Sequence, residues 1–181
     1  MSKGGDDLTG DLARWLAEAR VDEAAASRAR QRSLHQQAGE EATLAGVLLD
    51  LAERGAPVVV EVAGGHRHRA TVQAVAEDFC ALRTDQGEVL VAYAGVSAVA
   101  LLDPDDPPTG DRPRALDMTF VEALLVLVAE RPRVLVVARD GTGRAGELRS
   151  AGRDVVVLRT DGDPRHLYLP VGSIAEVRVT G

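Results

Sequence analysis

The stretch TLAGVLLDLAERGAPVVVEVAGG, residues 43–65, decides the fold because it changes from a helical pattern to a strand pattern. Its apolar residues first recur at i, i+3, i+4 and i+7, the spacing of one helix face: Leu44, Val47, Leu48 and Leu51. Gly55 followed by Pro57 is a typical helix end. The valine-rich run after Pro57 predicts a buried strand.

Downstream of this stretch, short runs rich in Val and Leu are separated by Gly and Asp turns, which predicts five strands. We expect them near residues 58–63, 66–76, 79–84, 88–92 and 96–101. Upstream, the proline-free segment from Leu8 to Arg54 predicts helix, interrupted near Gly39. Residues 1–39 are therefore interpreted as an N-terminal helical arm.

The pattern then occurs a second time. FVEALLVLVAERPRVLVVARDG, residues 120–141, shares the string AER with residues 43–65, and residues 155–177 share the string LRTD with residues 79–99. Shared strings in the same order, with strands and turns between them, indicate a tandem duplication. We predict a first domain over 40–102, a Pro- and Asp-rich linker over 103–118, and a second domain over 119–181.

Five short strands hide their edges most simply by closing into a small barrel. The Tyr93-Ala94-Gly95 run and its expected counterpart Pro170-Val171-Gly172 leave only a tight turn between strands four and five, which favours an SH3-like barrel. The predicted fold class is mainly β with α: an N-terminal helix, then two tandem units of one helix plus five strands.

Each predicted unit resembles the Sm-like family, including its bacterial RNA-chaperone branch. The likeness rests on the helix-to-strand stretch of residues 43–65 and on Gly141, Gly146 and Leu148, which stand at the G-x4-G-x-L spacing of the first family motif. It implies Sm-like barrels that join by pairing strand four of one unit with strand five of the next. A PRC-type or Tudor-like barrel is the structural alternative.

The sequence departs from the family where the family contacts RNA. Ala76 and Gly152 replace the motif aspartate, and Cys80 and Val156 replace the base-contacting asparagine. The inner-pore Lys-His pair is missing from both units. The resemblance therefore implies the barrel and transfers no RNA-contact residue.

Basic residues are the candidates for binding RNA. The run His66-Arg67-His68-Arg69 enters the second predicted strand, and alternation places the arginines and histidines on opposite faces. Residues 119–181 contain nine arginines among eight acidic residues. Five of these arginines are candidates for lining one rim of the second unit: Arg144, Arg149, Arg153, Arg159 and Arg165. The alternatives are a pH-sensitive patch formed by the two histidines, a solvated strand start, and a mixed-charge surface whose arginines pair with nearby acidic residues.

Composition limits the remaining function classes. The net charge of −7 and the 3% aromatic content give little support for nucleic-acid coating or base stacking. Catalytic motifs are missing, and His66 and His68 lack a nearby third metal ligand, so we expect no enzyme activity, cofactor or metal. We predict a cytoplasmic protein without a membrane span. The sequence has a single cysteine, Cys80, it lacks a secretory signal, and its apolar runs are far shorter than the about 20 residues that a span needs.

Two functions follow from these features. The first is a non-enzymatic interaction scaffold that associates with itself through barrel strand edges, or with another protein. The second is an RNA-binding protein that uses the arginines of the second unit and the residue 66–69 run. If family assembly carries over, three chains make a pseudo-hexameric ring, while a dimer and a pairing within one chain are alternatives.

Overall fold

The computed structural model describes residues 39–102, 116–162 and 165–180, with Pro108, Gly110 and six separate positions between residues 20 and 33. The chain divides into two compact units, residues 1–41 and 42–181. The fold described below is that of the second unit. Most of the N-terminal helical arm predicted over 1–39 and most of the 103–118 linker lie outside the described residues.

Helix α2 (Leu44–Arg54) starts and ends at residues that satisfy its terminal backbone groups. The Thr43 hydroxyl accepts the Gly46 N–H at 3.0 Å, and Gly55 adopts the left-handed conformation with φ 61°. Leu48 and Leu51 are fully buried. Each such burial stabilises the fold by about 1.5–3 kcal/mol. The predicted end of this helix at Gly55 is confirmed.

The strands after α2 lie within one residue of their predicted bounds: β1 (Pro57–Val62), β2 (His66–Val75), β3 (Phe79–Thr84), β4 (Gly87–Ala92) and β5 (Val96–Leu101). A 3-10 turn, η1 (Tyr93–Gly95), joins β4 to β5. The same order of elements then recurs: α3 (Phe120–Val128), β6 (Arg133–Ala138), β7 (Gly143–Ala151), β8 (Val155–Thr160), β9 (His166–Pro170), η2 (Val171–Ser173) and β10 (Ile174–Val179). We call residues 42–102 the first repeat and 116–180 the second repeat.

Backbone hydrogen bonds correct the sequence alignment of the two repeats by one residue. The Tyr93 N–H bonds the Asp78 carbonyl at 2.8 Å, and the Val171 N–H bonds the Asp154 carbonyl at 2.8 Å. Gly95 therefore corresponds to Ser173, whereas the sequence paired it with Gly172. The longer connection between β8 and β9 shifts the register of everything after it.

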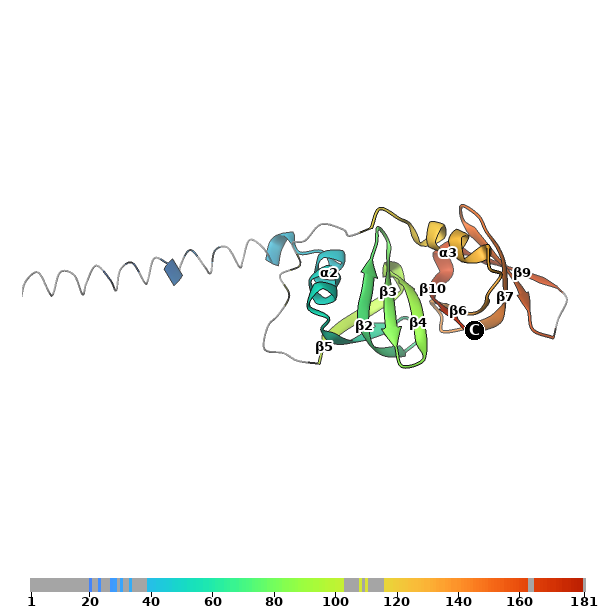
Figure 1. Ribbon diagram of the computed structural model, residues 1–181, viewed down its shortest axis with the longest axis horizontal. Coiled ribbons are helices and arrows are strands. Elements are labelled where there is room, and N and C mark those ends of the chain that lie inside the picture. Colours follow the sequence, from blue (N-terminus) through green and yellow to red (C-terminus); the bar gives the residue numbers. More distant parts are fainter. Residues whose placement is uncertain are drawn as a thin grey trace, which may run out of the picture. The chain divides into compact units, whose positions relative to one another are not determined.

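The strands form one ten-stranded antiparallel sheet in the order β5-β1-β2-β3-β4-β10-β6-β7-β8-β9 (Figure 1). The predicted mainly-β class with few helices is confirmed. The predicted closed barrels are not confirmed. The sheet is open, and β5 and β9 lie at its two ends. Strand β4 pairs with β10 of the second repeat, through Glu176↔Val91, Val177↔Leu90 and Arg178↔Val89. We call this contact the junction.

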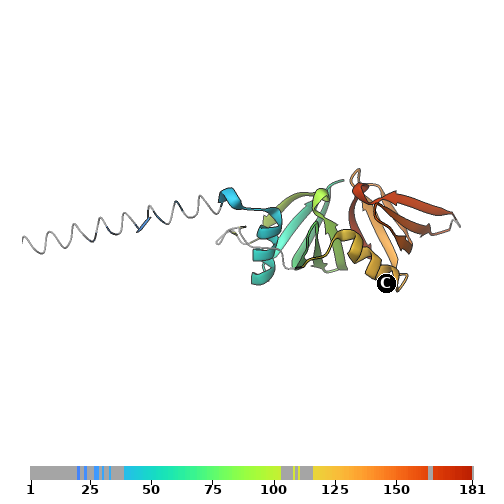
Figure 2. The ribbon, with the colours of Figure 1, turned by 90° about the horizontal axis from the view of Figure 1, so that it is seen from above.

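Two hydrophobic cores lie on either side of the junction. Helix α2 packs against the first repeat and α3 against the second, as the two ribbon views show (Figure 2). Each core also holds residues from the other repeat: Ala175 belongs to the first core, and Phe79 to the second. The Phe79 and Phe120 rings lie 5.9 Å apart, within the range of favourable aromatic pairs. The junction is thus a packed interface as well as a pair of strands.

Candidate functional site

The first-repeat pocket gathers the basic residues that enter β2. Its volume is about 160 Å³ and its lining consists of His66, Arg67, His68, Arg69, Thr84, Asp85, Gln86 and Arg178. The pocket exists because β3 pairs with β2 only from Ala70 onward, so residues 66–69 have no partner strand on that side. Arg67 and Arg69 are exposed and His68 is buried, in agreement with the predicted alternation.

The second-repeat pocket occupies the corresponding place on β7 and has a volume of about 310 Å³. Its lining consists of Arg144, Thr160, Arg165, His166 and Leu167. Arg144 corresponds to His68 and Thr160 to Thr84, because both pairs share one position in the strand register. Both repeats therefore present cationic side chains at the same point of the fold.

The other three candidate arginines lie outside both pockets. Arg149 is half-buried and forms an ion pair with Glu147 at 2.9 Å. Arg153 is exposed in the β7–β8 turn, and Arg159 is exposed on β8. The structure thus brings six of the nine candidates into two pockets, and of the second-repeat arginines Arg144 and Arg165 line the same pocket.

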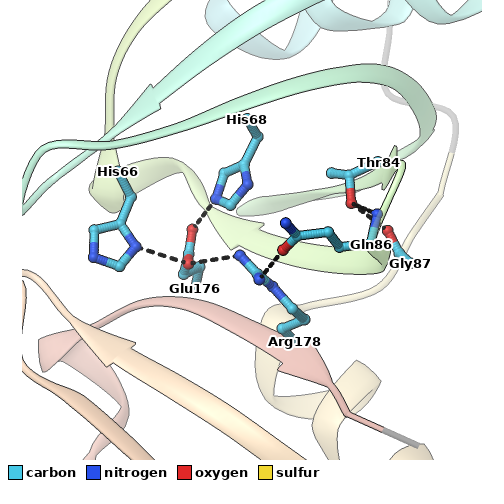
Figure 3. Close-up of polar contacts among 7 residues, drawn as sticks. All are labelled: His66, His68, Thr84, Gln86, Gly87, Glu176 and Arg178. Atoms are coloured by element: carbon cyan, nitrogen blue, oxygen red, sulfur yellow. Dashed lines mark hydrogen bonds and ion pairs between the residues drawn. The ribbon is translucent and has the colours of Figure 1, made fainter.

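Glu176 is the residue at this site that sequence reasoning missed. It lies on β10, is completely buried, and places its carboxylate between two histidines of the first repeat (Figure 3). His68 Nε2 donates a hydrogen bond to Glu176 Oε2, and His66 Nδ1 lies 3.4 Å from Oε1. The only sequence signal was a charged pair, Glu176 and Arg178, within a strand pattern rich in apolar residues, with no indication of their partners.

Burial pushes the pKa of Glu176 upward, but the hydrogen bond from His68 and the charges of His68, His66 and Arg178 outweigh it. The net pKa lies below the ordinary carboxylate value. Glu176 is therefore ionised at neutral pH although no solvent reaches it.

Arg178 completes this group on the β10 side. Its Nη2 lies 3.9 Å from Glu176 Oε1, and its Nη1 donates to Gln86 Oε1 at 2.8 Å. Within the part of the chain that the structure describes, Oε1 of Glu176 and Nε of Arg178 are buried without a hydrogen-bond partner. We call His66, His68, Glu176 and Arg178 the junction cluster.

Metal-type clusters and thiol chemistry can be assessed for the described residues. No set of three or more His, Cys, Asp or Glu side chains among them is arranged to hold a metal ion. Burial raises the pKa of the Cys80 thiol to about 12, so this side chain is a protonated core residue at neutral pH. No helix in the described part of the chain is both long and apolar enough to span a bilayer.

A groove beside the end strand β9 is the second-repeat counterpart of the surface that β10 covers in the first repeat. We call it the β9 groove; its volume is about 170 Å³. Its lining consists of Val136, Ala138, Asp140, Thr142, Arg144, Leu169, Ser173 and Ile174. Thr142 and Arg144 correspond to His66 and His68, which contact β10. The β9 groove is therefore a junction surface that no strand of the described residues covers.

No protein-family model matches the sequence, and no curated protein matches it at a significant level.

Proposed function

We propose that this protein is a non-enzymatic interaction scaffold made of two Sm-like units of five strands each, and that it assembles with itself through strands β5 and β9. One observation carries the proposal. The junction pairs strand four of the first repeat with strand five of the second. The strands left at the ends of the sheet are strand five of the first repeat (β5) and strand four of the second (β9). A strand four and a strand five are also the two strands that pair at the junction.

The junction also gives the expected register between two chains. Applying its pairing to the corresponding residues places Ala98 opposite Leu169, Val99 opposite Tyr168, and Ala100 opposite Leu167. An unpaired strand edge readily accepts another strand, and Tyr168 is 65% exposed on β9. Three chains joined in this way close a ring of six repeats, and two chains make a dimer if the angle differs.

Light scattering on the purified full-length chain across a concentration series tests the proposal. We expect a defined oligomer that Tyr168→Asp disrupts, because a charge on the strand edge opposes pairing. Ser150→Asp is the matched control, since Ser150 is exposed on the interior strand β7 and leaves both end strands intact. A monomer at all concentrations, or an oligomer unaffected by Tyr168→Asp, would contradict the proposal.

RNA binding is the second candidate, and the equivalent positions of the two cationic pockets favour it. Arginine-lined pockets in both repeats are suited to contact successive phosphates of one strand. Against this, Glu176 lies beneath the first-repeat pocket and offsets part of its positive charge. Binding of fluorescent poly-A and poly-U across a salt series tests it: micromolar affinity that weakens steeply with salt, and that Arg144→Ala reduces, supports this function.

A cytoplasmic location remains a prediction from the sequence. It accords with the proposal, since neither candidate function needs export or a bilayer.

A further inference from the structure

The junction cluster joins side chains from two repeats that are far apart in the sequence. His66 and His68 come from β2, while Glu176 and Arg178 come from β10, 108 residues beyond His68 (Figure 3). The buried Glu176 carboxylate therefore depends on the first repeat for its hydrogen bond. If the junction opens, the carboxylate loses this partner.

A buried carboxylate is stable only when cations and hydrogen-bond donors compensate for its lost hydration. With both histidines neutral, Glu176 retains one hydrogen bond from His68 and the Arg178 guanidinium at 3.9 Å. With the histidines protonated, two further positive charges face the same carboxylate. Histidine ordinarily gains its proton near pH 6.5, within the physiological range.

The cluster is specific to this junction. The residues of the second repeat that correspond to His66 and His68 are Thr142 and Arg144. In β5, the residues that correspond to Glu176 and Arg178 are Ala98 and Ala100.

We propose that the junction cluster makes the contact between the two repeats pH-sensitive, tightest at mildly acidic pH and weaker above neutrality. Loss of the histidine protons leaves the buried carboxylate with less compensating charge. At acid pH, the change in stability depends on Glu176. Because its pKa is lowered, its ionised form stabilises the junction above the ordinary carboxylate range, and this stabilisation is lost as the pH falls through the lowered pKa. This proposal concerns one chain and does not depend on self-association.

Other titratable groups near β10 do not replace the cluster. The β4 residues opposite Glu176 and Arg178 are valines, and the β6 residues paired with β10 are apolar. Tyr93 lies in η1; burial raises its pKa, and its hydroxyl donates a hydrogen bond to the Ala76 carbonyl. From the β3–β4 turn, Asp85 is exposed and Gln86 does not titrate, while Arg67 and Arg69 keep their charge throughout this range.

Hydrogen exchange of the β4 and β10 amides in the full-length protein, corrected for intrinsic rates, tests the proposal between pH 5.5 and 8.5. We expect wild-type protection to fall severalfold from pH 6 to pH 8. The fall should shrink in His68→Gln and His66→Gln and disappear in Glu176→Gln. His166→Gln, which alters an exposed histidine on β9, should behave as wild type.

A flat wild-type profile would overturn the proposal, and so would an equal fall in the wild-type protein and in His68→Gln. Should Glu176→Gln fail to fold, the two histidine variants and the wild-type profile decide the result by themselves. Amides of β7 and β8, which do not contact the cluster, report general pH effects in the same experiment.

Discussion

Gly95 and Ala175 belong to different repeats and lie so close that a Cβ atom on Gly95 would stand 2.7 Å from the Cα atom of Ala175. The nearest atoms include the backbone of Ala175, which cannot move as a flexible side chain does. Gly64 and Gly141 make a second approach of this kind, with 2.3 Å between a Cβ built on Gly64 and the Gly141 Cα. The junction therefore depends on close backbone packing as well as on its charged cluster.

Gly95→Ala should destabilise the protein by about 1–3 kcal/mol, the usual range for overpacking a close contact. Urea unfolding followed by circular dichroism measures the change. Gly172→Ala is the matched control, because no atom lies within 4 Å of a Cβ at that position. Equal stability of the two variants would show that the Gly95 contact is not tight in solution.

Ser173→Gly should strengthen association between chains. Ser173 corresponds to Gly95, so a junction of the same geometry between two chains would bring its Cβ against the backbone of the incoming β5. Removing that Cβ should lower the dissociation constant severalfold in analytical ultracentrifugation. Ser173→Ala keeps the Cβ and loses only the hydroxyl bond to the Pro170 carbonyl, so it should not tighten the assembly.

Asp78→Ala should cost about 1 kcal/mol, a typical value for losing a helix-capping interaction. The Asp78 carboxylate accepts the Phe120 N–H at 2.7 Å and so holds the first turn of α3 against the first repeat. The control is Asp154→Ala, which alters the equivalent aspartate of the second repeat, an exposed residue. Thermal unfolding should separate the two variants, and a loss of equal size in both would contradict this role for Asp78.

Cys80 should react slowly with a thiol reagent at pH 8 in the native protein. Its pKa rises from 9.0 to about 12, which lowers the thiolate fraction about a thousandfold, and the side chain is fully buried. The labelling rate should rise to that of a free thiol in urea. Because burial raises this pKa, the associated stability is present below pH 9 and falls as the pH rises toward 12. Fast labelling without denaturant would contradict the buried position.

Local patterns were sufficient to predict most individual elements. The end of α2 at Gly55 and the bounds of β1 to β5 follow from apolar spacing and from turn residues, which act over a few positions. The repeat itself follows from the shared AER and LRTD strings. The one-residue misalignment of Gly95 with Gly172 arose because the loops before them differ in length. Short shared strings do not determine the alignment beyond such a loop.

The candidate site was predicted only in part. The sequence singled out residues 66–69, and the structure places all four in one pocket. No partner of His66 or His68 could be predicted from the sequence, because Glu176 and Arg178 approach them only after β10 has paired with β4. Arg149, by contrast, pairs locally with Glu147, as the mixed-charge interpretation expected.

The sequence by itself determined which segments are helices and strands and that their order occurs twice, because periodicity and turn chemistry are local properties. Only the tertiary structure decided that β4 pairs with β10 and that the sheet stays open. Strand five of either repeat presents a similar apolar pattern to β4, so pattern alone does not choose between them. The choice depends on contacts between distant residues, namely Gly95 against Ala175, Phe79 against Phe120, and His68 with Glu176.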